Sequence, residues 1–391
     1  MFRKWFRRVS PRRLQRPYSG LRAGSDDRSL VLQTTSEKEC NMVRVPILSW
    51  RVPRNDRALS RRRFLIQVGV IACFVLAWSV QPLWAGQFTE IVAFGDSLTD
   101  TGNAFAKSGN TRPDPNYYYQ GRWSNGPIWV ERLASLLGVP NPTPSLLGGT
   151  NNAWPGAETG LTGVSVFGTP NLGNQITNYL GSHSTLNAGQ LIVVWGGGND
   201  FGFAGQTDPS VPVANLSQEI TMLTQHGGKY FLVPNLLPIG EEPLFKQMGP
   251  EAEARFNLLA SQFNSLLAAE LTRLERTLGI TIFRFDVASL FEQIFNDPVA
   301  FGFIFTNVTE QAKSGGFGQP GTVVPNPDQY LWWDGGHPTR VANQIIGDRA
   351  LGAMFSFAVA APASVPSGTP STSSSPPGTR LGTSTSTTRA R

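Results

Sequence analysis

Residues 91–103 read Ile-Val-Ala-Phe-Gly-Asp-Ser-Leu-Thr-Asp-Thr-Gly-Asn, so that four apolar residues end at a glycine, an acid and a serine. A short apolar run that stops at Gly-Asp-Ser is typical of a buried strand that delivers a serine to a sharp turn. Because open α/β sheets place their chemistry at the carboxyl ends of strands, Ser97 lies where a nucleophile is expected. A serine after a glycine can equally cap a helix, so this stretch alone leaves both interpretations open.

Three further apolar runs predict buried strands, at residues 191–195, 230–233 and 281–285. Apolar residues at helical spacing predict helices over about residues 128–137, 213–225, 250–278 and 341–357. Strands that alternate with helices favour a mainly parallel sheet that is covered on both faces. The expected fold class is therefore α/β.

Several loops carry residues that suit catalysis. Asn199 follows the strand at residues 191–195, and its amide either shapes a turn or donates to an oxyanion. Gly156 either serves a plain turn or lets the backbone approach a ligand closely. Asp334 lies three residues before His337 on one tight loop, where its carboxylate can orient the imidazole and stabilise the imidazole cation.

The loop at residues 117–127 is rich in aromatic and turn-forming residues. Its three tyrosines, Tyr117, Tyr118 and Tyr119, either pack beneath a loop or line the mouth of a substrate site. The sequence leaves both alternatives open.

The net charge of +6 does not indicate a nucleic-acid partner. Residues 1–85 hold 17 of the 33 Lys and Arg but only 5 of the 27 Asp and Glu, so the remainder is acidic. The two cysteines, Cys40 and Cys73, also lie in this leader, and the three histidines show no ligand spacing. We therefore expect neither a disulfide nor a metal site in the rest of the chain.

A signal-like pattern precedes the first strand. Three arginines at residues 61–63 are followed by an apolar run over residues 64–80 and a small residue, Ala85, which is the order found in signal peptides. The Arg-Arg pair before Phe-Leu resembles a twin-arginine export signal, so we expect a bacterial periplasmic or extracellular protein. The alternative is an uncleaved membrane anchor, through which residues 64–80 would contact a membrane.

The remaining boundaries follow from composition. Residues 1–59 are basic, without strong periodicity, and are expected to be disordered. Residues 60–85 form the signal or anchor, and residues 86–358 form the folded domain. Residues 359–391 are rich in Ser, Thr and Pro and are expected to be a disordered tail.

The stretch at residues 94–103 is followed in order by four more blocks, at residues 121–129, 151–157, 198–200 and 334–339. Together they resemble the GDSL, or SGNH, family of lipases and acylhydrolases, in particular its plant-type and bacterial secreted branch. The resemblance covers about residues 90–355. It implies a three-layer α/β/α fold, like that of flavodoxin, around a mainly parallel sheet of about five strands.

The resemblance also implies residue roles. Ser97 is similar to the family's nucleophile, His337 to its general base and Asp334 to the acid that orients the base. The oxyanion hole would be formed by the backbone N–H of Ser97, the N–H of Gly156 and the side chain of Asn199. These roles agree with the physics, because a serine hydroxyl needs a base and an oxyanion needs preorganised donors.

One block departs from the family pattern. Relatives usually carry Gly-Gly where this chain has Pro155-Gly156, although Gly156 keeps its own N–H. Three other polar residues match the family pattern, namely Asp96, Asp100 and Asn103. They are interpreted as structural supports of the serine turn. The Gly-x-Ser-x-Gly elbow of α/β-hydrolases is absent.

The leading hypothesis is an exported serine ester hydrolase, acting as a monomer without cofactor or metal on small-molecule or lipid acyl esters. The first alternative is a carbohydrate O-acetyl esterase on the same scaffold. The second alternative is a catalytically silent surface-binding protein, which the intact set of Ser97, Asn199, Asp334 and His337 argues against.

Overall fold

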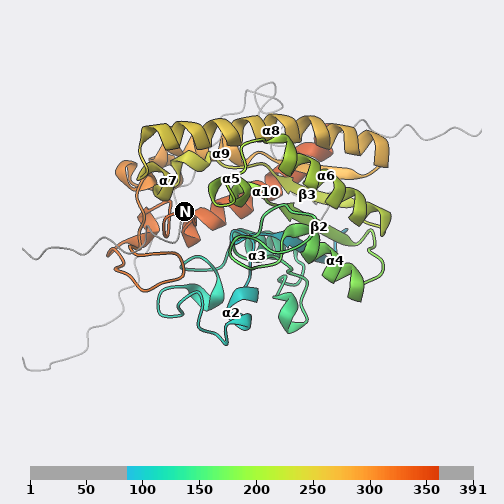
Figure 1. Ribbon diagram of the computed structural model, residues 1–391, viewed down its shortest axis with the longest axis horizontal. Helices are drawn as coiled ribbons and strands as arrows, with labels where there is room; N and C mark the ends of the chain where they lie inside the picture. The colour runs from blue at the N-terminus through green and yellow to red at the C-terminus, as the bar shows by residue number, and fades with distance from the viewer. Residues whose placement is uncertain (1–85, 361–391) are drawn as a thin grey trace, which may run out of the picture. The chain divides into compact units, whose positions relative to one another are not determined.

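Four parallel strands form the central sheet of the computed structural model, which describes residues 86–360, with side chains up to residue 356 (Figure 1). The strands are β1 (Glu90–Gly95), β2 (Gln190–Trp195), β3 (Tyr230–Pro234) and β4 (Thr281–Phe285). They lie in the order β1-β2-β3-β4, and all neighbouring pairs are parallel. The carboxyl ends of all four strands therefore lie at the same end of the sheet, where the polar loops begin. The predicted extension, signal and tail lie outside the described residues.

The expected fifth strand is not a regular strand. Residues 150–154 run beside the free edge of β1, where the N–H of Ala93 donates to Thr150 (3.0 Å) and the N–H of Asn152 donates to Ala93 (2.7 Å). Only one ladder bridge forms there, between Ala93 and Asn151. The Asn151 side chain donates to the Thr99 carbonyl oxygen at 2.7 Å, which ties this segment to the turn after β1. The described residues thus contain four strands, with an irregular segment in the fifth position.

This segment explains where the site lies. It follows β1 in the chain and lies on one side of it, whereas β2 lies on the other side. After β1, the chain thus passes first along one side of this strand and later, as β2, along its other side. In open α/β sheets such a switch point opens a crevice at the carboxyl ends of the strands.

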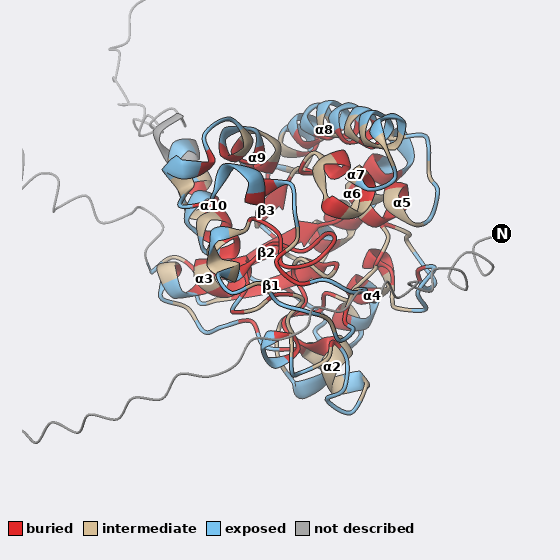
Figure 2. Cartoon of the chain, turned by 90° about the vertical axis from the view of Figure 1, so that its left-hand side faces the viewer, coloured by how far each residue is buried: buried red, intermediate tan, exposed pale blue. Residues whose placement is uncertain are grey.

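Helices cover both faces of the sheet, which confirms the three-layer α/β/α prediction (Figure 2). One face carries α3 (Trp129–Leu137), α9 (Val287–Asn296) and α10 (Arg340–Ala360), and the other carries α4 (Leu172–Ser182), α6 (Ser210–Gln225) and α8 (Pro250–Leu278). The short helices are α2 (Asn103–Lys107), α5 (Gly198–Gly202) and α7 (Pro243–Lys246). The 3₁₀ turns are η2 (Tyr119–Gly121), η3 (Ser145–Leu147), η4 (Ile239–Glu241), η5 (Pro298–Phe301), η6 (Phe305–Val308) and η7 (Pro327–Gln329).

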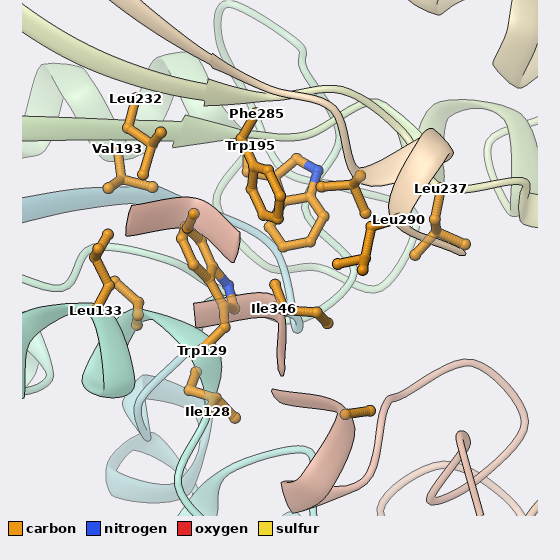
Figure 3. Packing of buried hydrophobic residues seen from close by; sticks show 14 of the residues in the cluster. Ile128, Trp129, Leu133, Val193, Trp195, Leu232, Leu237, Phe285, Leu290 and Ile346 are labelled. Atoms are coloured by element: carbon orange, nitrogen blue, oxygen red, sulfur yellow. The ribbon is translucent and has the colours of Figure 1, made fainter. Parts of the chain in front are cut away.

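The two cores follow from the alternation of side chains along the strands. In β2, Val193 and Trp195 pack with α3, α9 and α10, whereas Ile192 and Val194 pack with the opposite layer. Figure 3 shows Trp129 against Trp195 in the first core, with ring centroids 5.3 Å apart. Because every residue of β2 is buried, an apolar run rather than an alternating pattern is expected there.

A seam between α3 and α10 fixes the two ends of the domain to each other. The Trp129 N–H at the start of α3 donates to the Asn343 side chain of α10 at 3.1 Å. Gly347 lets the two helices approach, because a Cβ there would lie 2.8 Å from the carbonyl oxygen of Trp129. Since α10 begins at Arg340, the seam holds the loop that carries His337. No helix within residues 86–360 has the length and apolar character that a membrane span requires.

Candidate active site

Ser97, His337 and Asp334 form a chain of hydrogen bonds at the carboxyl end of β1. The Oγ of Ser97 lies 2.9 Å from Nε2 of His337, and Nδ1 of His337 lies 2.7 Å from Oδ1 of Asp334. The serine and the histidine are 240 residues apart in the chain, and the fold brings them together as expected. In this arrangement a histidine can take the serine proton while the acid fixes its tautomer.

Asp334 is fully buried and accepts three hydrogen bonds besides the one from the His337 ring. Its Oδ1 accepts from the N–H groups of Gly336 (3.2 Å) and His337 (3.0 Å), and its Oδ2 accepts from the hydroxyl of Tyr118 (2.7 Å). Burial alone would raise the pKa of Asp334, but the charge of His337 and these hydrogen bonds hold that pKa below its usual value. Asp334 therefore remains ionised beside the histidine.

Tyr118 is the residue that links Asp334 to a distant loop. Its hydroxyl donates to Asp334 and accepts from the N–H of Gly318 at 2.9 Å. Burial and the Asp334 charge raise the pKa of Tyr118, so the phenol stays protonated and can donate. Of the two alternatives for this tyrosine, packing beneath a loop is correct, because Tyr118 is buried against Trp123 and Trp333.

The turn that presents Ser97 is shaped by its neighbours. Gly95 has no room for a side chain, because a Cβ there would lie 2.7 Å from the carbonyl oxygen of Trp195. The side-chain amide of Gln175 on α4 makes two hydrogen bonds with the Gly95 backbone. Its Oε1 accepts from the Gly95 N–H at 3.0 Å, and its Nε2 donates to the Gly95 carbonyl oxygen at 2.9 Å. Asp96 accepts from the N–H of Leu98 at 3.0 Å. These contacts fix the backbone at the end of β1 and thereby the position of Ser97.

Asp100 and Asn103 support the same turn, as their predicted structural role requires. Asp100 accepts from the N–H groups of Gly102 (2.8 Å) and Asn103 (2.6 Å). The Asn103 amide donates to the carbonyl groups of Asn151 (2.8 Å) and Ala153 (3.0 Å). The serine turn is thereby tied to the irregular segment beside β1.

Two backbone N–H groups are free to meet an oxyanion. Ser97 and Gly156 line the same cavity, and within residues 86–360 neither N–H donates to a protein acceptor. Gly156 has a φ of +72°, and a Cβ there would lie 2.4 Å from the Phe167 ring, so both conformation and space require glycine. The proline at position 155 leaves this N–H in place.

Asn199 lies at the same cavity, but its amide hydrogens are already engaged. Its Nδ2 donates to the Ala157 carbonyl at 3.0 Å and to Oδ2 of Asp96 at 3.2 Å. Donation to an oxyanion would therefore replace or share the longer bond to Asp96. Burial raises the pKa of Asp96 to about 6, against the lowering effect of its hydrogen bond with Leu98 and of the His337 charge.

Ser97 and His337 open into a cavity of about 460 Å³, within the usual range for small-ligand sites. Aromatic rings form much of its wall: Trp123 lies 5.3 Å and Phe317 lies 5.0 Å from the His337 ring, measured between centroids. Phe203 and Phe245 continue this wall away from the histidine. The cavity thus offers an apolar surface to a substrate held at Ser97.

Glu242 is an ionisable side chain in this wall that takes no part in the hydrogen-bond chain from Ser97 to Asp334. Its Oε2 lies so close to Gly336 that a Cβ on that glycine would be 2.7 Å from it. Its carboxyl has no hydrogen-bond partner among the described residues, whereas that of Glu241 is held by Lys246 and Asn257. Burial, and then the charges of Asp96 and Asp334, raise the pKa of Glu242 well above its usual value.

Comparison with known proteins assigns this architecture. The family model described as GDSL-like Lipase/Acylhydrolase matches residues 91–350, which is most of the domain. The chain belongs to this family. It is a hydrolase of carboxylic esters.

Named relatives of this GDSL hydrolase occur in bacteria and plants. It is 29% identical over 266 residues to the phosphatidylcholine-sterol acyltransferase of Aeromonas hydrophila, a match that covers 66% of this chain and 73% of the relative. It is 27% identical to GDSL esterase/lipase At1g71250 of Arabidopsis thaliana, over 75% of this chain and 94% of the relative. A solved lipolytic G-D-S-L family protein of Veillonella parvula is 17% identical with a TM-score of 0.37, over 67% of this chain and 96% of that chain.

Sequence reasoning on this GDSL hydrolase missed three residues at the site. Gln175 and Glu242 belong to no motif, and the sequence did not pair Tyr118 with Asp334; each of the three reaches the site from a distant part of the chain. Residues 238–243 read Pro-Ile-Gly-Glu-Glu-Pro, and the two prolines were the one available signal for Glu242, because they restrict the backbone that carries it.

Proposed function

We propose that Ser97 is the nucleophile of this ester hydrolase, that His337 is its general base and acid, and that Asp334 orients His337. The observation that carries this proposal is the continuous chain of hydrogen bonds from Ser97 Oγ to Asp334 at 2.9 and 2.7 Å, opening on a cavity. An isolated buried histidine would not be expected to face both a serine hydroxyl and an acid.

In the acylation step, Ser97 Oγ attacks the ester carbonyl carbon while Nε2 of His337 accepts its proton. The carbonyl oxygen becomes an oxyanion that accepts from the N–H groups of Ser97 and Gly156 and from the Asn199 amide. The bond to the alcohol oxygen then breaks, and His337 returns the proton to that oxygen. The products are an acyl ester on Ser97 and the free alcohol.

Deacylation repeats these steps with water. His337 takes a proton from water, the resulting hydroxide attacks the acyl carbon, and the same donors hold the second oxyanion. When the bond to Ser97 breaks, His337 gives the proton back to Ser97 Oγ. The carboxylic acid leaves and the site returns to its starting state.

We infer that the acyl group is a fatty chain of medium or greater length. The cavity wall is largely aromatic and aliphatic, and an acyl chain on Ser97 would displace water from Phe203 and Phe245. Each buried methylene favours binding by about 0.8 kcal/mol, so longer chains gain affinity until the cavity is filled. An acetyl group would leave most of the apolar cavity wall in contact with water.

Export is a further part of the proposal. It rests on the arginines and the apolar run at residues 61–80, which lie outside the described residues. If the run is retained instead of cleaved, the same domain would be held at a membrane. N-terminal sequencing of the protein recovered from its host would distinguish cleavage near Ala85 from retention.

The experiment is a comparison of the protein with Ser97→Ala on aryl esters of graded chain length and on a fluorophosphonate probe. We expect covalent labelling of the protein only, a loss of roughly 10⁶-fold in kcat for Ser97→Ala, and a rate optimum at chains longer than acetyl. Ser135→Ala is the matched control, because Ser135 is an exposed serine on α3 outside the cavity.

Unchanged hydrolysis by Ser97→Ala would disprove the assignment of the nucleophile. A preference for acetyl esters alone, together with release of acetate from acetyl-xylan, would favour the carbohydrate O-acetyl esterase. An absence of turnover on every ester, with retained binding to glycans, would favour the surface-binding alternative.

A further inference from the structure

The loop at residues 158–171, here called the mouth loop, exposes three apolar side chains at its tip. Val164, Val166 and Phe167 are 58%, 60% and 56% exposed. Single exposed apolar residues are ordinary, but here three lie within four positions of one loop. Exposed apolar side chains that gather on a folded protein are typical of surfaces that bind a partner protein, a ligand or a membrane.

The mouth loop is an ordered structure, so this exposure is not a consequence of missing backbone contacts. The N–H of Ser165 donates to Thr169 and the N–H of Gly168 donates to Ser165, both at 2.8 Å. The N–H of Val166 donates to the Glu158 carboxylate at 2.8 Å. The tip is therefore a closed turn whose backbone is satisfied while its apolar side chains face outward.

The same tip forms part of the rim of the catalytic cavity. Phe167 lines the cavity together with Ser97, stands over Gly156 and packs on Phe203 with ring centroids 5.2 Å apart. Anything that covers Val164 and Val166 thus comes to lie at the entrance to Ser97.

Two unpaired cations line the same cavity. Lys107, in the last turn of α2, and Arg112, in the loop after it, are both exposed. Within the part of the chain that the structure describes, neither side chain contacts a carboxylate, whereas Arg122, Arg132 and Lys246 are each paired with an acid. The rim therefore combines apolar anchors with free positive charge.

We propose that the tip of the mouth loop, with Lys107 and Arg112, docks the enzyme onto an anionic lipid surface with the cavity entrance facing the lipid. Apolar side chains enter the boundary of the acyl chains and cations meet acidic headgroups, which is how proteins that lie on a membrane are held. The proposal rests on the proposed function, because docking would bring acyl esters to Ser97. It adds that the enzyme meets its substrate at a lipid surface rather than as dissolved molecules.

The first test places an environment-sensitive NBD fluorophore on the mouth loop of the full chain. Cys40 and Cys73 are replaced by Ser, and Val166→Cys carries the label; Val299→Cys is the matched control, since Val299 is 72% exposed on η5 and does not line the cavity. Vesicles of ether-linked phospholipids, with or without an anionic headgroup, cannot be hydrolysed. We expect a blue shift and enhancement at position 166 with anionic vesicles and none at position 299.

This site-specific readout separates docking by the mouth loop from attachment through the leader. If the leader alone bound the vesicles, both labels would stay in water, and that result would overturn the proposal. An equal shift at both positions would also overturn it, because it would indicate non-specific adsorption of the domain.

The second test removes the cations. Lys107→Gln with Arg112→Gln should raise the anionic vesicle concentration needed for the shift at position 166 by about 30-fold, about fivefold for each charge. The double variant should behave like the parent on zwitterionic vesicles. An unchanged requirement for anionic vesicles would disprove the role of the cations.

The third test separates this proposal from the proposed function. Val164→Ser with Val166→Ser should slow hydrolysis of vesicle-borne esters at least tenfold and leave a soluble short-chain ester unaffected, because neither valine lines the cavity. Equal losses on both substrates, or no loss on vesicles, would contradict docking. A parent protein without activity on any soluble ester would instead contradict the proposed function, while the fluorescence result would still stand.

Discussion

At the scale of single residues, Asp334 does more than face the histidine. Its second oxygen is occupied by the Tyr118 hydroxyl, so the carboxylate is held from both sides. A buried carboxylate with donors on both oxygens keeps its charge without solvent. The acid can therefore stay ionised in a site that must exclude water when a substrate chain enters.

Glu242 gives the substrate site a dependence on pH. Its pKa is raised, so the carboxyl is neutral in acid and ionises as the pH rises; the ionised form needs water that an acyl chain displaces. We expect the KM for a neutral long-chain ester to rise with pH in the parent protein. In Glu242→Gln the KM should change at least threefold less between pH 5 and pH 9.

The control for this prediction is Glu241→Gln. Glu241 is the neighbouring residue of the same type, but its carboxylate is held by Lys246 at 2.6 Å. Its KM profile should match that of the parent in steady-state assays. If Glu242→Gln shows the same rise in KM as the parent, the pH dependence arises elsewhere.

Single residues were predictable where chemistry is local. Asp334 and His337 share a loop, and Ser97 follows a strand, so their neighbours in sequence reveal them. Tyr118 and Glu242 have ordinary local sequences, and only the fold brings them to the triad. No spacing rule connects Tyr118 with Asp334, which is 216 positions away, or Glu242 with the loop of His337.

At the scale of elements, the seam of α3 and α10 holds the start of the helix that follows the base. The helix α3 follows the segment that contains Ser97, whereas α10 starts three residues after His337. Small residues at such contacts let helices approach closely, and larger ones force them apart. A change in this seam should therefore affect both stability and catalysis.

Gly347→Ala tests the seam. The added Cβ would lie 2.6 Å from the Arg132 side chain and 2.8 Å from the Trp129 carbonyl. We expect a loss of about 1–3 kcal/mol in the free energy of unfolding, measured with urea, and a lower kcat. Gly352→Ala lies in the same helix with nothing within 4 Å, so it should stabilise by up to about 1 kcal/mol.

Equal effects of the two alanines would show that helix propensity, rather than contact at the seam, controls this region. Among the elements, the four regular strands and the helices α3, α6, α8 and α10 were predicted, because each has a sustained apolar pattern; α6 begins at Ser210 rather than at the predicted residue 213. The segment at residues 150–154 has no such pattern. Its place beside β1 depends on backbone hydrogen bonds that a sequence does not display.

At the scale of the whole domain, buried acids make stability depend on pH. Burial raises the pKa of Asp96, Asp100 and Asp200 to about 6, and raises that of Glu219 well above its usual value. The unfolded chain loses these protons at a lower pH than the folded domain. Each of these groups therefore lowers the free energy of unfolding as the pH rises from about 4 through its folded pKa.

Glu219→Met isolates one of these contributions. Both carboxyl oxygens of Glu219 are buried on α6 without a partner among the described residues. We expect the variant to be more stable than the parent by about 1–3 kcal/mol at pH 8, and by less at pH 4.5, where the acid is protonated in the folded domain and about half protonated in the unfolded chain. Thermal unfolding at the two pH values measures the difference.

Gln218→Met is the matched control, since Gln218 is exposed on the same helix. It should change stability by no more than about 0.5 kcal/mol at either pH. A gain for Glu219→Met that does not grow with pH would mean that packing, rather than ionisation, accounts for it.

The direction of the chain through the sheet has a practical consequence for attachment. The polypeptide enters at the amino end of β1, and Ser97 follows its carboxyl end, so the entry lies away from the catalytic rim. After His337, α10 continues for 21 residues, about 30 Å, along the side of the domain. A tether, display scaffold or resin joined directly at residue 86 or residue 360 of the domain would thus begin away from the entrance.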